Sequence, residues 1–458
     1  MVITSYEFLL LFLPLTLTIY WRTRHKLTLL FISSYLFYAL GGLIFIPLLL
    51  GLSLTTYWLA HTKRYSWGIA LNLLALLIFK YLNFGVDTLN SIGGYLGMTA
   101  LIPLFELALP LGISFFVFKH IGYLLDIRAG SYEPVHSKLL FTTYSAFFPQ
   151  ISAGPLSIGN DTLNQLAHLP QRLPADQLYS GLAWISIGLA KKILIADTLN
   201  SALQSGFYNP DPASGGLIWA WASVGIFALQ LYFDFSSYTD IVLGISRLLG
   251  VSLLPNFDNP YLATTPADFW QRWHISLSRW FRFYLFSPLR RSLLKRWGAQ
   301  HSERAQYSAN FITMGLIGLW HGAGWGFVLW GVYHGLLLNI YAAARRRKIK
   351  LENRVLLVFS VLVGWALFAS PDLNFAAQLF AGLFGLQGLG DVTMIAAYLN
   401  PLVVIALTVA TFMTVTGCVE AANLPGLHRP GYAIVLGILL IVGLLHLNDA
   451  ASFIYTQF

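Results

Sequence analysis

Long apolar runs follow one another along the whole chain, and this pattern restricts the fold more than any other feature of the sequence. A helix that crosses a membrane needs about 20 mostly apolar residues. Helices satisfy their own backbone hydrogen bonds in lipid, and the runs are too uniform for the alternating pattern of a membrane β-barrel. We therefore predict an all-α polytopic membrane protein with about 10 to 13 embedded helices, some of them short or re-entrant. The runs lie near residues 6–21, 27–41, 43–60, 67–84, 101–118, 137–153, 178–196, 216–233, 307–320, 323–343, 354–370, 395–417 and 431–447.

The composition leaves no room for a soluble domain. Hydrophobic residues make up 57% of the 458 residues and charged residues only 10%, whereas a soluble domain carries about 25% charged residues. We therefore expect one membrane domain over residues 1–458. Cys418 is the only cysteine, which excludes an intramolecular disulfide and a cysteine-based zinc site, and no bound metal is expected. The first run carries Glu7 and no basic residue, unlike a signal peptide, so we expect it to be retained.

Two basic blocks set the predicted orientation. One runs from Arg272 to Arg296 and the other from Arg345 to Lys350. Lys and Arg in short loops mark the cytoplasmic side, so we place both blocks there, and the basic-free stretches 85–100 and 201–216 outside. Anionic lipid head groups account for such blocks, and a cationic vestibule would also attract a phosphorylated donor such as an acyl thioester of coenzyme A. The blocks follow membrane spans and form no soluble module, so we predict no nucleic-acid binding.

The stretch LIGLWHGAGWGFVLWGVYHGLLL, residues 316–338, places two histidines in an apolar environment. Ionisable groups inside membrane spans are costly and tend to be functional, which singles out His321. We predict a helical pair over 307–343 with His321 at its turn, deep in the bilayer or toward the outer side. Gly322, Gly324 and Gly326 are expected to allow a close approach of backbone or substrate. His334 is expected to form a packing hydrogen bond between helices.

The stretch TTPADFWQRWHISLSRWFRFYL, residues 264–285, has the pattern of one amphipathic interfacial helix. Thr265 suits the N-cap, Pro266 the first turn and Asp268 a capping box. His274 lies near the border between an aromatic face and a basic one, within predicted cytoplasmic interfacial helices over 256–304. The basic face, which would attract an anionic donor, consists of Arg272, Arg279 and Arg282.

The residues alone indicate a membrane protein with a buried functional histidine. Histidine is the default general base near neutral pH. The chain has no Gly-x-Ser-x-Gly elbow, no P-loop and no acidic or histidine cluster with metal-ligand spacing. Acyl transfer and proton-coupled transport both fit these observations.

Several longer stretches resemble the membrane-bound O-acyltransferase family over nearly the whole chain. They are LPLGISFFVFKHIGYLLD (109–126), FFPQISAGPL (147–156), YFDFSSYTDIVLGISRLLG (232–250), NFDNPYLATTPADFWQRWHISLSRWFR (256–282), the His321 stretch and the closing FIYTQF. The sequence is most similar to the bacterial branch that contains alginate O-acetyltransferases and D-alanyl transfer proteins.

The resemblance implies a helix bundle around a central tunnel, in which a cytoplasmic funnel meets an opening from the other side. His321 matches the hallmark histidine, as catalytic base or acyl relay, and His274 matches the second family histidine. It further implies that acetyl-coenzyme A is a substrate rather than a bound cofactor, and that a polysaccharide outside the bacterial inner membrane receives the acetyl group, with a periplasmic acetyltransferase partner. Residues expected along the tunnel are Trp320, Trp273, Asp234 and Ser278.

The sequence departs from the family pattern at a few positions. Phe283 stands where an aspartate is usual, Lys119 and His120 stand where a glutamine without a following histidine is common, and Ala369 replaces an arginine. Two alternatives stay open at this stage. One is D-alanyl transfer from a carrier-protein thioester to teichoic acid, and the other is a transporter or flippase with a protonatable His321.

Overall fold

The computed structural model describes residues 2–98, 102–158, 161–208, 212, 215–396, 398–421, 424, 431–447, 451 and 453. Helices make up most of these residues and none of them forms a strand, which confirms the all-α prediction. Only Phe453 of the closing FIYTQF stretch is among them. The chain forms two compact units, and each is described separately below. The expectation of a single domain stays a prediction.

Within the described residues, four continuous helical stretches are long and apolar enough to cross a membrane. They are Lys26–His61, Tyr65–Tyr95, Gly216–Leu248 and Trp325–Arg346. Four shorter apolar helices accompany them in the described part of the chain, at Arg354–Ala369, Leu373–Leu383, Pro401–Thr416 and Gly431–Leu445. These spans confirm a polytopic membrane protein.

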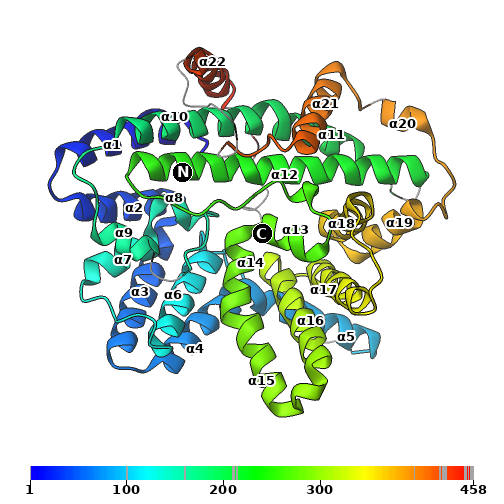
Figure 1. Cartoon of the computed structure of the whole chain (residues 1–458), viewed down its shortest axis with the longest axis horizontal. Helices are drawn as coiled ribbons and strands as arrows, with labels where there is room; N and C mark the ends of the chain where they lie inside the picture. The colour runs from blue at the N-terminus through cyan, green and yellow to red at the C-terminus, as the bar shows by residue number, and fades with distance from the viewer. Residues whose placement is uncertain are drawn as a thin grey trace. The chain divides into compact units, whose positions relative to one another are not determined.

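Unit 1 comprises Met1–Pro174 and Ser246–Leu253. Its helices, labelled in Figure 1, are α1 (Leu13–Arg22), α2 (Lys26–Gly42), α3 (Ile46–His61), α4 (Tyr65–Leu76), α5 (Leu82–Tyr95), α6 (Ile113–Arg128), α7 (Lys138–Ala146), α8 (Phe148–Ile151) and α9 (Asp161–Ala167). The predicted run at 101–118 is wrong in its first part, because the helix begins only at Ile113. Gly112 before it has φ +65°, and a Cβ there would lie 1.8 Å from the Ile151 carbonyl oxygen, so the chain turns at a position that requires glycine.

A buried polar network joins four helices of unit 1 around His120. His120 is 0% exposed in α6. Its Nδ1 lies 2.9 Å from Asn72 Oδ1 of α4, and its Nε2 lies 2.8 Å from Ser145 Oγ of α7. The Asn72 amide nitrogen donates to Thr56 Oγ1 of α3 at 2.9 Å. His120 stands out in the sequence only as a departure from the family pattern, and this network was not predicted because its members come from distant parts of the chain.

Unit 2 comprises Ala175–Ile245 and Leu254–Phe458. Its helices are α10 (Ala175–Ala190), α11 (Thr198–Gly206), α12 (Gly216–Leu248, whose last turn belongs to unit 1), α13 (Pro266–Arg272), α14 (Ile275–Phe281), α15 (Ser287–Trp297), α16 (Ser302–His321), α17 (Trp325–Arg346), α18 (Arg354–Ala369), α19 (Leu373–Leu383), α20 (Val392–Ala396), α21 (Pro401–Thr416) and α22 (Gly431–Leu445). Two π-helical turns, η4 (Lys191–Asp197) and η7 (Arg282–Phe286), and a 3-10 turn, η8 (Ala299–His301), connect some of these helices.

The helices α16 and α17 form the predicted pair and run side by side in Figure 1. Their backbones meet at two glycines. A Cβ at Gly318 would lie 2.1 Å from the Phe327 carbonyl oxygen, and one at Gly331 would lie 2.2 Å from the Met314 carbonyl oxygen. The glycines of this stretch therefore serve helix packing, and at Gly322 it is the Phe327 ring that fills the space.

The single amphipathic helix predicted over 264–285 is wrong, because the helix breaks at His274. Thr265 does cap α13, since its Oγ1 accepts from the Asp268 backbone nitrogen at 3.2 Å. The helix ends at Arg272, and His274 adopts a left-handed backbone with φ +44° before α14 begins. This break turns the His274 side chain from the expected border position into the interior.

Candidate active site

The structure brings His274 and His321 together. His321 is the last residue of α16, so it lies at the turn before α17 as predicted. His274 is 0% exposed and His321 is 2% exposed. Their ring centroids lie 6.2 Å apart. His274 and His321 thus form one buried pair, although they are 47 positions apart in the sequence (321 − 274).

Aromatic rings enclose the pair. The Phe235 ring of α12 lies 4.8 Å from the His274 ring. The Trp330 and Phe368 rings lie 5.2 and 5.4 Å from the His321 ring. Trp320 contacts both histidines, at 6.0 Å from His274 and 5.1 Å from His321. Such walls exclude water, which strengthens electrostatic interactions and suits acyl chemistry.

Backbone hydrogen bonds hold His274 in its left-handed conformation. A non-glycine residue in this region costs about 1–3 kcal/mol and persists only when its surroundings fix it. The Ile275 nitrogen donates to the Asn256 carbonyl oxygen at 2.8 Å, and the Asp258 nitrogen donates to the Arg272 carbonyl oxygen at 3.0 Å. Residues 256–258 are therefore hydrogen-bonded to the chain on both sides of His274.

Burial also sets the protonation of this ring. His274 lies in the link between α13 and α14, outside the four candidate membrane spans. Burial lowers its pKa to about 3, because a charged imidazolium is poorly solvated there. The ring is therefore neutral near pH 7.

A basic cavity of about 1180 Å³ lies beside the pair within unit 2. Residues of α13, α14, α16 and α17 and of the stretch after α17 line it. Ile275 follows His274 in the chain and Ile317 lies one helical turn before His321, but neither histidine itself lines the cavity. Its cationic lining residues are Arg279, Arg282, Arg345, Arg346, Lys348 and Lys350.

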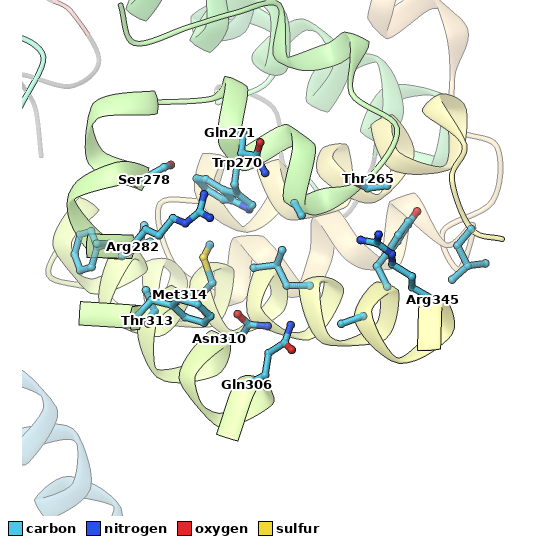
Figure 2. A pocket seen from close by; sticks show the side chains of 18 of the residues that line it. Thr265, Trp270, Gln271, Ser278, Arg282, Gln306, Asn310, Thr313, Met314 and Arg345 are labelled. Carbon is cyan, nitrogen blue, oxygen red and sulfur yellow. The ribbon is translucent and has the colours of Figure 1, made fainter. Parts of the chain in front are cut away.

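Figure 2 shows how polar and charged side chains are distributed around this cavity. Arg282 points inward toward Trp270 and Met314, while Arg345 lies at the opposite end. Gln306, Asn310 and Thr313 follow one face of α16 at spacings of four and three residues. The cavity therefore combines a basic periphery with a polar wall of amides and a hydroxyl.

The other predicted site residues fall in different places. Ser278, Arg279 and Arg282 line the cavity. Arg272 does not line it, because its Nε donates to Asp268 Oδ1 at 2.8 Å within α13. Trp273 is fully buried and stacks on Phe269 at 5.7 Å. Its neighbours make it part of the wall behind His274.

Asp234 belongs to a buried ion-pair network rather than to the histidine pair. Lys192 Nζ lies 2.7 Å from Asp234 Oδ1 and 2.8 Å from Asp197 Oδ1. The neighbouring Lys191 lies 2.7 Å from Asp240 Oδ2. Phe235, the residue after Asp234, is the one that contacts His274. The sequence showed two lysines in an apolar run but not which carboxylates pair with them.

His334 lies in the same aromatic cluster but not in contact with a polar partner. It is 1% exposed, with the Trp330 and Trp270 rings at 5.0 and 5.1 Å. Neither ring nitrogen has a hydrogen-bond partner among the residues that the structure describes. The predicted packing hydrogen bond is therefore wrong for this part of the chain. Within the same described part, no group of three or more His, Cys, Asp or Glu side chains could hold a metal ion.

The sequence of this chain is similar to those of known membrane-bound acyltransferases. The sequence model of the membrane-bound O-acyltransferase family matches residues 135–355. A "probable alginate O-acetylase AlgI" from Pseudomonas aeruginosa is 34% identical over 87% of this chain and 80% of its own. A peptidoglycan O-acetyltransferase from Helicobacter pylori is 31% identical over 78% of this chain and 73% of its own.

A teichoic acid D-alanyltransferase from Bacillus subtilis is 27% identical over 68% of this chain and 87% of its own. The matched family stretch contains both histidines of the buried pair and every residue that lines the cavity. The similarity to the alginate relatives extends well beyond it. This chain belongs to the membrane-bound O-acyltransferase family and is an O-acyltransferase.

Proposed function

We propose that this enzyme takes an acetyl group from acetyl-coenzyme A at the cytoplasmic face of the bacterial inner membrane and delivers it for O-acetylation of an extracytoplasmic polysaccharide. The buried pair of His274 and His321 behind a basic cavity carries the proposal. The names of the relatives support it, since they describe O-acetylation of alginate and of peptidoglycan. A periplasmic acetyltransferase partner would complete the delivery to the polysaccharide.

The cavity suits a donor with several phosphate groups. Six cationic side chains line it, against one acidic side chain, Glu352. Arginine binds phosphate through paired hydrogen bonds and lysine through its point charge. The amides of Gln306 and Asn310 offer hydrogen bonds to the amide groups of the pantetheine arm. We therefore place the coenzyme in this cavity with its thioester toward the histidine pair.

His321 acts as the catalytic base or as an acyl relay. As a base, it takes the proton of the acceptor hydroxyl while the hydroxyl oxygen attacks the thioester carbon. The carbon–sulfur bond then breaks, and the proton passes to the departing thiolate of coenzyme A. As a relay, a ring nitrogen of His321 attacks the thioester carbon, the carbon–sulfur bond breaks and coenzyme A leaves as the thiolate. The acceptor hydroxyl oxygen then attacks the acetyl carbon, the bond from this carbon to the ring nitrogen breaks, and the hydroxyl proton passes to the thiolate. His274 supports the donor end of this passage in either case.

The test is thiol release from acetyl-coenzyme A by the purified protein in lipid nanodiscs, with and without an oligosaccharide acceptor. We expect turnover by the wild type and its loss in His321→Ala. His301→Ala is the matched control, because His301 is an exposed histidine in η8. A fully active His321→Ala variant would overturn the catalytic assignment.

D-alanyl transfer is the second candidate, because the Bacillus relative is named for it. The same assay with a D-alanyl carrier protein as donor separates the two. Turnover of the carrier-protein thioester but not of acetyl-coenzyme A would reverse the proposed donor. A transporter is no longer proposed, since the family is one of acyltransferases.

A further inference from the structure

The segment Val419–Ala421 after α21 brings a carboxyl group into the interior of unit 2. Glu420 is 4% exposed and accepts a hydrogen bond from the Tyr232 hydroxyl of α12. Lys191 Nζ donates to the Val419 carbonyl oxygen at 3.1 Å and anchors the same segment. A buried carboxyl group is costly, and its cost is offset only by well-placed partners. An ionisable side chain at such a place in a membrane protein is by default a functional candidate.

Tyr232 connects this carboxyl group to the wall behind His274. The Tyr232 ring lies 5.9 Å from the Trp273 ring and 5.6 Å from the Phe257 ring. Trp273 directly precedes His274, and Phe257 contacts Phe235 at 5.0 Å. Phe235 in turn contacts His274. One ring, Trp273, therefore lies between Tyr232 and the residue His274 on the first route, and two rings, Phe257 and Phe235, lie between them on the second.

The segment that leads to Glu420 also packs against the loop that flanks His274. A Cβ at Gly417 would lie 3.6 Å from the Asn259 Cγ. Asn259 has φ +45°, so it is, like His274, a non-glycine residue in the left-handed region. Residues 256–258 next to it make the hydrogen bonds that flank His274. Asn259 and His274 are thus two strained residues in segments that are hydrogen-bonded to each other. Backbone strain of this kind persists only where the surrounding structure fixes it.

We propose that Glu420 is a positioning residue that acts through Tyr232. It holds the 256–259 loop and Trp273 in the arrangement that keeps His274 beside His321. This inference rests on the proposed function insofar as that function places His274 in the active site. It adds a residue outside the matched family stretch, which ends at 355.

The experiment compares Glu420→Ala, Glu420→Gln and Tyr232→Phe with the wild type in acetyl-coenzyme A turnover. We expect Glu420→Ala to lower kcat by about 100-fold, because a small displacement of a reacting group has an effect of that order. The KM for acetyl-coenzyme A stays unchanged, because Glu420 does not line the cavity. Glu420→Gln retains most of kcat, because its amide oxygen accepts the same hydrogen bond, and Tyr232→Phe loses it.

Tyr208→Phe is the matched control. The Tyr208 hydroxyl donates to the Ala369 carbonyl oxygen at 3.2 Å in the same unit, away from Glu420, so kcat should not change. Tyr232→Phe removes a single oxygen atom and keeps the inference testable should Glu420→Ala not fold. An unchanged kcat in folded Tyr232→Phe and Glu420→Ala would overturn it.

A double-mutant cycle with His274→Gly tests whether the effect passes through His274. Glycine suits the left-handed backbone there. We expect Glu420→Ala to lower kcat no further in the His274→Gly background, and an additive loss would overturn the inference. Absence of turnover by the wild type is a failure of the proposed function alone. The coupling is then measured from the thermal unfolding midpoints of the same four proteins, where additive shifts would overturn it.

Discussion

The two units each bury histidines, but they surround them differently. In unit 1, both nitrogens of His120 lie within 3 Å of polar side-chain atoms, the Asn72 Oδ1 and the Ser145 Oγ. In unit 2, the His274, His321 and His334 rings lie among tryptophan and phenylalanine rings. The exposed fractions do not separate the two groups, since none exceeds 2%.

The difference shows that burial alone does not mark a functional histidine. Buried polar groups in a folded protein are normally hydrogen-bonded, and a satisfied network makes the local structure rigid. His120 fits that description and has the contacts of a structural residue. The unit 2 histidines lie beside a basic cavity and inside apolar walls, which is the environment expected of a reacting group. Five substitutions, two of them at cavity arginines, test this contrast.

Of these substitutions, removal of the His274 ring should have the largest effect, second only to that of His321→Ala. We expect His274→Gly to lower kcat by about 100-fold, because loss of a side chain that positions the donor beside His321 has an effect of that order. Glycine suits the left-handed backbone at 274 but leaves a cavity among the aromatic rings, so kcat is compared per folded molecule. Initial rates with saturating acetyl-coenzyme A measure this effect. Wild-type rates in a folded variant would remove His274 from the site and weaken the contrast with His120.

Replacement of the cavity arginines should have the second largest effect on activity, through the KM for acetyl-coenzyme A. We expect Arg279→Gln and Arg282→Gln each to raise the KM for acetyl-coenzyme A roughly tenfold, because each loses a charge-assisted hydrogen bond to phosphate. The value of kcat should stay near that of the wild type. Arg291→Gln is the matched control, because Arg291 is exposed in α15 and does not line the cavity. Equal KM changes in all three variants would indicate a general charge effect instead of a binding site.

Replacement of His120 should affect stability and not catalysis. His120→Leu leaves Asn72 and Ser145 without their shared partner, at a cost of about 1–3 kcal/mol each in the free energy of unfolding. The thermal midpoint in detergent should therefore fall, while kcat per folded molecule stays unchanged. A large loss of kcat in the folded fraction would contradict the structural assignment of His120.

Replacement of His334 should have the smallest effect on stability. Its ring nitrogens have no hydrogen-bond partner in the described chain, so His334→Leu breaks no hydrogen bond that the structure describes there. We expect the free energy of unfolding to change by less than about 1 kcal/mol, since apolar side chains of similar volume are tolerated in packed interiors. Thermal unfolding beside His120→Leu measures this. A fall as large as that of His120→Leu would show that His334 has a structural partner after all.

Local patterns in the sequence were enough to predict the class of fold and the place of His321. The apolar runs predicted the helices, and the cost of an ionisable group in a span singled out His321 at the α16–α17 turn. The cap of α13 at Thr265 was also predictable, because it depends on residues three apart.

The features that the sequence did not predict depend on contacts between distant segments. Local periodicity favours a continuous helix through His274, and the break arises from hydrogen bonds to Asn256 and Asp258. The pairing of Lys192 with Asp234 and of Tyr232 with Glu420 joins residues far apart in the chain. No pattern within a short window of sequence contains this information, so the burial of the Glu420 carboxyl group was not predictable from it.

The cavity has a further consequence for how such enzymes diversify. All its lining residues come from one stretch of the chain, from Thr265 to Glu352. A single recombination event that exchanges this stretch would replace the entire chamber at once and leave the surrounding scaffold intact. Donor preference would then be transferred with this one segment. Chimaeras between relatives with different donors can be built by joining their sequences before Thr265 and after Glu352.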